Sequence, residues 1–183
     1  MTTNTARILV ILAAIAAAAA LRLVPHPPNF MPIGALALFG GAMLGRRALA
    51  FAAPLGALVL SDLVLGVYPE IVFVYASVAL SVLIGWAIPS RRPALAIGGA
   101  AVASAVLFFI VTNFGTWLLS GFYPRTVEGL IGCYVAAIPF FQNTLAADLF
   151  YSALLFGGFA LIEQLVPALR DPGRPVATSP TGR

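Results

Sequence analysis

Apolar residues run along the chain in blocks, and charged residues and prolines separate the blocks. Six blocks predict helices that cross or enter a lipid bilayer. The predicted helices cover residues 8–21, 33–44, 48–68, 71–88, 94–119 and 143–166. The second is the shortest, and about 12 residues also fit a re-entrant helix that does not cross fully.

The last apolar stretch, Gly129 to Leu169, is too long for one crossing. About 41 residues in a helix reach about 60 Å, twice the thickness of the hydrocarbon layer. We expect Pro139 to divide the stretch, because proline interrupts helix hydrogen bonding. The prediction is a short helix from Val127 to Ile138, followed by the sixth span from Asn143 to Val166.

Composition strengthens this interpretation, because 61% of the residues are hydrophobic and only 9% are charged. A soluble domain is about 25% charged. We therefore predict an all-α, polytopic membrane helical bundle of about six transmembrane helices in one domain, residues 1–170. The tail, residues 171–183, is rich in Pro, Gly, Ser and Thr, and we expect it to be disordered.

The ten positive residues are all arginines and are scattered, so no basic stripe predicts binding of nucleic acid. A single cysteine, Cys133, excludes an intrachain disulfide and a cysteine zinc site. No motif predicts a metal ion or a cofactor.

Arginine positions predict the orientation, since loops on the cytoplasmic side of a membrane carry more arginine. With both termini cytoplasmic in a bacterial inner membrane, eight arginines lie inside and two outside. The inner arginines are Arg7, Arg46, Arg47, Arg91, Arg92, Arg170, Arg174 and Arg183, and the outer ones are Arg22 and Arg125. The first apolar block also fits a cleaved signal peptide, and this count does not distinguish the two possibilities.

Three buried polar residues are predicted near the outer surface. Asp62 lies about six residues before the outer end of the third span, and Asn113 about six before that of the fifth. Asp148 lies about five residues after the start of the sixth. At 1.5 Å per residue all three lie about 8–9 Å deep. Polar residues inside a bilayer usually face a wet cavity or the bundle interior, so this layer predicts an outward-facing pocket.

Helical spacing adds aromatic walls to the predicted pocket. Trp117 shares a face with Asn113, and Tyr151 shares one with Asp148. Aromatic walls with a few polar groups are typical of small-molecule sites. Trp117 also fits the aromatic belt of the membrane interface.

The segment from Leu23 to Pro32 contains four prolines and is expected to be a stiff loop. It either covers the pocket or merely connects two helices. In the first case Arg22, His26 and Asn29 shape the entrance.

Structural alternatives exist for several of these residues. Asp62 or Asp148 could pair with Arg22 only to neutralise buried charge. Cys133 fits a packing residue, or a reactive thiol or soft metal ligand in the pocket. In the first helix, small residues at Ala14 and Ala18 favour close helix contact, either with a transmembrane coupling subunit or within the bundle.

The chain resembles a bacterial family of small, uncharacterised multi-pass membrane proteins classed as transport proteins. The resemblance rests on RLVPHPPNFMPIGALALFGGA (22–42), SDLVLG (61–66), TNFGTW (112–117) and YPRTVEGLIGCYVAAIPFFQNTLAADLFYSALLFG (123–157). It covers nearly the whole chain except the tail. The family typically has Thr where this chain has Met31, which removes one hydroxyl. The resemblance implies a transporter-like role without naming a substrate.

More remotely, the layout is similar to the substrate-binding S components of energy-coupling-factor vitamin transporters. Those are six-helix proteins of similar size with an outward-facing pocket. The similarity implies that the first connecting loop acts as a gate and that small residues of the first helix contact a transmembrane coupling subunit. It is a likeness of fold, and fold alone does not define function.

The leading hypothesis is a substrate-capture component that binds a small vitamin-like or amine-bearing solute. Its contacts would be Asp62, Asn113 and Asp148, with Trp117 and Tyr151 as walls. The alternatives are an intramembrane enzyme that uses buried Asp, His or Cys residues, and a structural subunit without a ligand. No HExxH or GxSxG motif is present, and the expected role is not that of an enzyme.

Overall fold

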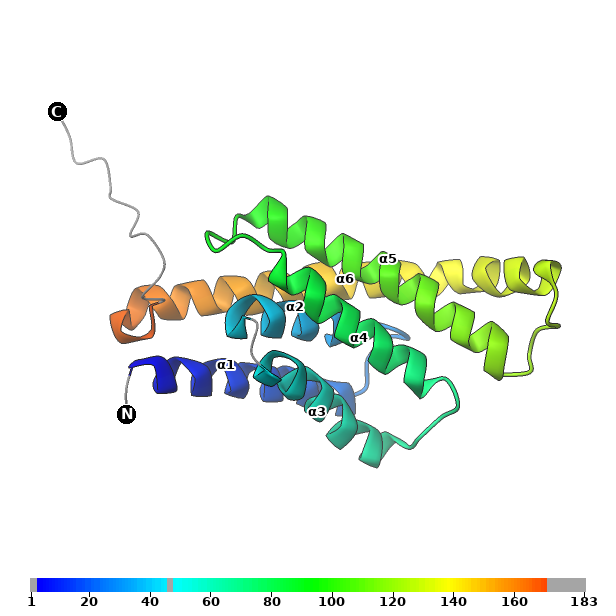
Figure 1. The fold of residues 1–183 in the computed structure, drawn as a ribbon, viewed down its shortest axis with the longest axis horizontal. Coiled ribbons are helices and arrows are strands. Elements are labelled where there is room, and N and C mark those ends of the chain that lie inside the picture. Colours follow the sequence, from blue (N-terminus) through cyan, green and yellow to red (C-terminus); the bar gives the residue numbers. More distant parts are fainter. Residues whose placement is uncertain (1–2, 46–47, 171–183) are drawn as a thin grey trace.

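The computed structural model describes residues 3–45 and 48–170. Within this part the chain is all-α and has no strand. The helices are α1 (Thr3–Ala20), η1 (Leu21–Leu23), α2 (Ile33–Leu44), α3 (Ala48–Leu65), α4 (Ile71–Trp86), α5 (Ala94–Leu119), α6 (Val127–Leu165) and η2 (Pro167–Leu169) (Figure 1). The predicted disordered tail, 171–183, and the Arg46–Arg47 pair lie outside the described residues.

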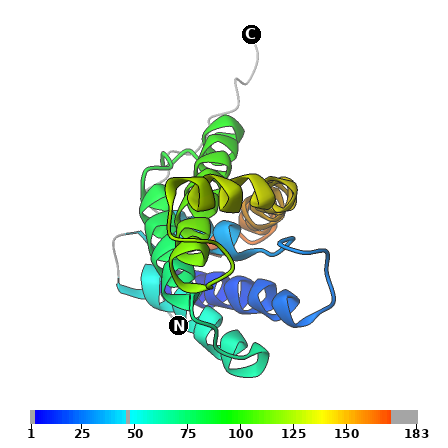
Figure 2. The same cartoon turned by 90° about the vertical axis from the view of Figure 1, so that its right-hand side faces the viewer.

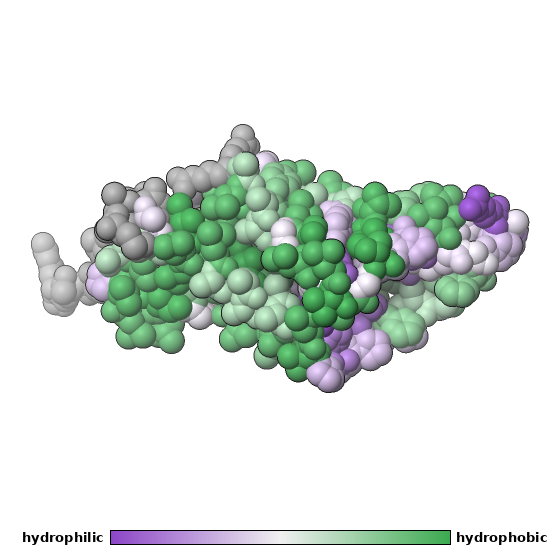
Figure 3. Space-filling model, turned by 90° about the horizontal axis from the view of Figure 1, so that it is seen from below, coloured by the Kyte–Doolittle hydropathy of each residue, from purple (hydrophilic) through white to green (hydrophobic). Residues whose placement is uncertain are grey.

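The protein is a membrane helical bundle, as the composition predicts. Four helices, α1, α3, α5 and α6, are long and apolar enough to cross a bilayer. The helices α2 and α4 are shorter, with 12 and 16 residues. Large apolar side chains such as Leu63, Val64 and Leu95 point outward, and Figure 3 shows a mostly hydrophobic surface. Such a surface suits lipid as the surrounding solvent.

The centre of the bundle is α2. Every residue of this helix except Ala42 is buried, and all five other α-helices contact it. Two glycines allow its close approach to α4: a Cβ on Gly41 would overlap the carbonyl of Val82, and one on Gly85 would overlap the carbonyl of Leu38. Figure 2 shows α2 enclosed between the other helices. At 1.5 Å per residue it is about 18 Å long, which is shorter than the hydrocarbon layer.

The predicted break at Pro139 is wrong, because α6 runs without interruption from Val127 to Leu165. Pro139 removes one helix hydrogen bond, but neighbouring helices stabilise proline-containing membrane helices. Here α5 contacts α6 on both sides of the proline. Tyr134 donates a hydrogen bond to the carbonyl of Ile110 over 2.7 Å, and the rings of Phe141 and Phe109 lie 5.1 Å apart.

The continuous helix changes the position of Asp148 within its helix. Asp148 lies 21 residues after the first residue of α6, about 31 Å along the axis. The separate helix expected to start at Asn143, five residues before Asp148, is therefore absent, and Asp148 lies near the middle of α6. Asn113 of α5 lies beside the N-terminal part of α6, where Cys133 donates to its carbonyl at 3.4 Å. The α5–α6 hairpin extends beyond the remaining helices at this end (Figure 1).

The opposite end of the bundle is closed by ion pairs. Arg7 at the start of α1 lies 2.6 Å from the carboxylate of Glu163 near the end of α6. Arg92, between α4 and α5, lies 3.6 Å from the same carboxylate. The guanidinium of Arg7 also stacks over the ring of Phe159 at 5.1 Å. These contacts fix three parts of the chain to one another.

Candidate functional site

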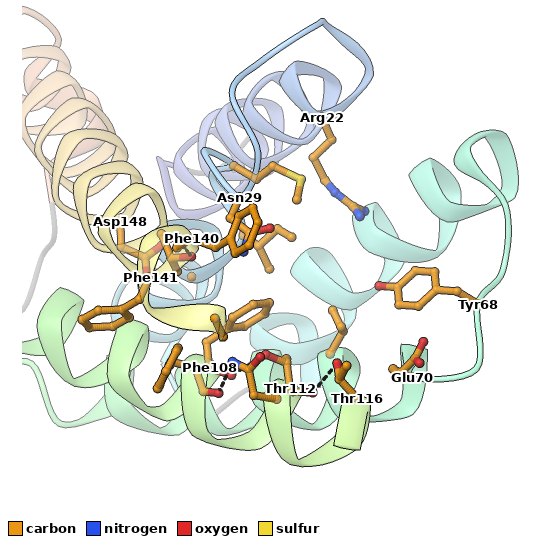
Figure 4. A pocket seen from close by; sticks show the side chains of 18 residues that line it. Arg22, Asn29, Tyr68, Glu70, Phe108, Thr112, Thr116, Phe140, Phe141 and Asp148 are labelled. Carbon is orange, nitrogen blue, oxygen red and sulfur yellow. Dashed lines mark hydrogen bonds between the residues drawn. The ribbon is translucent and has the colours of Figure 1, made fainter. Parts of the chain in front are cut away.

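A cavity of about 270 Å³ lies between the start of α2, the α3–α4 turn, α5 and α6. This volume is slightly below the roughly 300–1,000 Å³ of typical ligand pockets. Figure 4 shows Asp148 and Phe140 on one side, Tyr68 and Glu70 on the other, and Thr112 and Thr116 along α5. The cavity therefore combines charged, hydroxyl and aromatic groups.

Asp148 is the most deeply buried acid that lines the cavity, and only 1% of it is exposed. Its carboxyl group faces the first turn of α2, where the backbone N–H groups of Gly34 and Ala35 donate toward it. The N-terminus of a helix favours negative charge. The Oδ2 atom has no hydrogen-bond partner among the described residues. Asp148 thus places a buried, unsatisfied acceptor atom in the wall of the cavity, against Gly34.

The contact between α6 and α2 depends on a glycine. A Cβ on Gly34 would overlap both carboxyl oxygens of Asp148, so any larger residue would push the carboxylate away. The sequence contains this glycine two residues after Pro32, but nothing local to it indicates a partner 114 residues away.

Asp62 does not line the cavity. Its Oδ1 atom lies 2.9 Å from the Arg22 guanidinium, and the Tyr75 hydroxyl donates to Oδ2 over 2.9 Å. Arg22 also donates to the hydroxyl of Ser61. Asp62 and Arg22 therefore form a buried ion pair, which is the structural alternative considered for Asp62.

Arg22 nevertheless reaches the cavity and lines it. Because Asp62 neutralises its charge, the guanidinium contributes hydrogen-bond donors rather than net positive charge. Its Nε atom is buried and has no partner within the described part of the chain. Asp148 has no arginine or histidine partner within 4.0 Å in the same part.

Two further predicted residues line the cavity. Asn113 does so from α5, and its side-chain amide also donates to the carbonyl of Phe109 at 2.8 Å. Asn29 does so from the proline-rich loop, where it adopts a left-handed backbone with φ of 60°. Asparagine tolerates this conformation better than most residues. The loop is anchored to α6, because Asn143 donates to the carbonyl of Pro28 at 2.9 Å.

The remaining three predicted residues do not line the cavity. The indole of Trp117 donates to the carbonyl of Pro124 at 3.0 Å and ties the end of α5 to the hairpin. The Tyr151 ring packs 5.7 Å from Phe30. The His26 ring contacts the carbonyl of Pro27.

The structure adds residues that were not predicted. On α5 they are Phe108, Phe109, Thr112 and Thr116, and on α6 they are Ala137, Phe140, Phe141 and Thr144. Both groups follow helical spacing through Asn113 and Asp148 respectively. Helical spacing was the sequence signal for these residues, but it identifies a shared cavity only once α5 and α6 are known to face each other.

Tyr68 and Glu70 reach the cavity from the α3–α4 turn. Burial, followed by the nearby Asp62 carboxylate, raises the pKa of Tyr68 above its usual value of 10. The phenol of Tyr68 therefore stays protonated at physiological pH and presents a neutral hydroxyl to the cavity.

The candidate catalytic residues do not meet in one place. Cys133 is buried between α5 and α6 and donates to the Asn113 carbonyl. His26 and Cys133 are both absent from the lining of the cavity that holds Asp148. Across residues 3–45 and 48–170, no group of three His, Cys, Asp or Glu side chains is arranged to hold a metal ion.

The small residues of α1, expected to contact either a partner subunit or the bundle itself, lie against the hydrophobic core. Ala18 is buried in the hydrophobic core, and Ala14 is partly buried against it. Their close contacts therefore serve the fold of this chain.

Comparison with known proteins gives one finding. A family model described as "Family of unknown function (DUF6580)" matches residues 2–169. No curated protein and no solved structure matches the chain.

Proposed function

The chain belongs to the DUF6580 family of unknown function, and we propose that it captures a small solute in the cavity beside Asp148. The observation that carries this proposal is the unpartnered Oδ2 atom of a fully buried carboxylate that lines the cavity. An unsatisfied buried acceptor costs about 1–3 kcal/mol. A bound solute that donates to this atom would recover that free energy.

The surroundings of Asp148 support binding rather than packing. A packing carboxylate is normally neutralised by a cation, as Asp62 is by Arg22. Asp148 instead lies against the first turn of α2 with no arginine or histidine partner among the described residues, and space for a solute remains next to it.

The role we propose is that of a transport protein, similar in layout to substrate-capturing S components. We further propose that the cavity opens to the outer side of a bacterial inner membrane. The arginine distribution supports this orientation, because the ion-paired end carries Arg7, Arg92 and Arg170, whereas the cavity end carries Arg22 and Arg125. A transmembrane partner or an ion gradient would supply the energy.

The experiment is a thermal-stability screen of the purified full chain in maltoside detergent against a library of small polar solutes. A ligand that binds only the folded protein raises its melting temperature. We expect at least one solute to stabilise the wild type, and Asp148→Asn to abolish that shift. Glu128→Gln is the matched control, because Glu128 lies exposed at the start of α6, outside the cavity.

The proposal fails if no solute stabilises the wild type. It also fails if the solute stabilises Asp148→Asn and wild type equally, because the binding site would then lie elsewhere.

A further inference from the structure

The cavity has an aromatic lining that its polar groups alone do not explain. Phe108 and Phe109 contribute from α5, Phe140 and Phe141 from α6, and Tyr68 from the α3–α4 turn. Three separate elements therefore bring five aromatic rings to one space of about 270 Å³. Aromatic rings present negative faces, and they attract organic cations that have lost part of their water.

The carboxylates that line the cavity are negative, like the faces of the aromatic rings. Asp148 and Glu70 both line it. The positive residue that lines it, Arg22, is paired with Asp62 at 2.9 Å. If all four groups are ionised, the cavity and its ion pair carry a net charge of −2. An anionic solute would be repelled by Asp148, while a cation would be attracted to it.

From this combination we propose that the solute is a substituted ammonium ion, with the positive group between Asp148 and the aromatic rings. This inference rests on the proposed function and adds the chemical class of the solute. A metal ion would find one buried carboxylate and no cluster of three His, Cys, Asp or Glu ligands among the described residues. Carbon substituents on the nitrogen would instead bury apolar surface against the rings.

The test compares matched cations and neutral molecules by titration calorimetry on the full chain. The probes are methylammonium, tetramethylammonium and choline, together with 3,3-dimethylbutan-1-ol, the uncharged carbon isostere of choline. Maltoside detergent is used because it carries no ammonium group that could compete. We expect at least one ammonium probe to bind, and choline to bind at least tenfold more tightly than its isostere.

Variants assign the binding to the cavity. Asp148→Asn should reduce choline affinity at least tenfold, and Phe140→Leu should reduce it severalfold. Phe122→Leu is the control for loss of an aromatic ring, because Phe122 is 83% exposed on the α5–α6 hairpin. Melting curves of each variant without ligand establish that it is folded before its affinity is compared.

The outcomes separate the two proposals. Equal binding of choline and its isostere, or binding of anionic solutes only, overturns the ammonium inference but leaves solute capture intact. The ammonium inference is also overturned if none of the probes binds while another solute binds at Asp148. A wild type that binds nothing in this panel or in the wider screen overturns both.

A last arm distinguishes a free solute from a lipid headgroup of the same chemistry. A soluble short-chain phosphatidylcholine is titrated under the same conditions. Binding at least tenfold tighter than that of choline, and lost in Asp148→Asn, would keep the ammonium site but replace the free solute by a lipid. Weaker binding than that of choline supports the free solute.

Discussion

Two buried aspartates show that equal burial leads to different roles. Asp62 and Asp148 are 2% and 1% exposed, respectively. Asp62 meets Arg22 and Tyr75, and its charge is compensated by the guanidinium. Asp148 meets backbone N–H groups and an open space. The partners of each carboxylate, rather than its depth, distinguish the ion-paired Asp62 from Asp148, for which we propose a binding role.

Breaking the Arg22–Asp62 pair should destabilise the protein strongly. Asp62→Asn leaves a buried guanidinium without its counter-charge, which typically costs 3–5 kcal/mol. We expect a loss of roughly this size in reversible unfolding in mixed detergent. The double variant Arg22→Gln/Asp62→Asn should recover part of the loss, because no uncompensated charge remains. Losses that simply add in the double variant would show that the pair is not coupled.

Substitution of Gly34 should damage the site more than the fold. In Gly34→Ala the added Cβ overlaps the Asp148 carboxyl oxygens, so the carboxylate must move away from α2. Overpacking of this kind costs about 1–3 kcal/mol. We expect the ligand-induced thermal shift to disappear in a variant that still folds. Gly99→Ala is the control, since a Cβ there meets nothing within 4 Å; a ligand shift retained in Gly34→Ala would contradict this account.

At the scale of elements, the sequence predicts helices well where apolar length alone defines them. Both α2 and α5 have the predicted bounds, and α3 and α4 end two or three residues before the predicted position. The prediction fails at Pro139, because the rule that proline ends a helix considers only the hydrogen bonds of that helix and ignores contacts with neighbouring helices. Contacts with α5, made by Tyr134 and Phe141 of α6 on either side of the proline, outweigh that local cost. The candidate site shows the same limit. Several of its polar residues could be identified from the sequence, but the Gly34–Asp148 contact could not, because it depends on how α2 and α6 are aligned with each other.

Replacing Pro139 should therefore strengthen α6. In Pro139→Ala an N–H group returns to an exposed position inside a continuous helix, and we expect the free energy of unfolding to rise by about 1 kcal/mol or more. Pro54→Ala provides the contrast. Pro54 is fully buried inside α3, so truncation leaves a void that offsets the gain. A large loss of stability in Pro139→Ala would mean that α6 depends on its proline.

At the scale of the whole molecule, the two ends of the bundle differ in a way that bears on the side of the membrane from which a solute would enter. One end is sealed by Arg7, Arg92 and Glu163. The other holds the cavity and the α5–α6 hairpin. A protein that exposes a cavity at one end and a closed ion-paired surface at the other fits capture from a single side of the membrane.

The proposed orientation can be measured with single cysteines. In a Cys133→Ala background, Ser120→Cys in the hairpin should react with a membrane-impermeant maleimide applied to intact spheroplasts. Ser90→Cys, between α4 and α5 at the ion-paired end, should react only after the membrane is opened. The reverse pattern would place the cavity on the cytoplasmic side and would overturn capture from outside.

The shortness of α2 has a consequence for biogenesis. A helix of 12 residues is too short to be integrated as a stable span by itself, and α4, its closest packing partner, begins 27 residues later. During synthesis, α2 therefore becomes stable in the bilayer only after later helices have been inserted and pack against it. The last contacts come from α6, where Phe156 and Phe159 pack against Phe39 of α2, and Asp148 of the same helix is the last lining residue of the cavity along the chain. The cavity is thus completed only when almost all of the protein has been made and inserted.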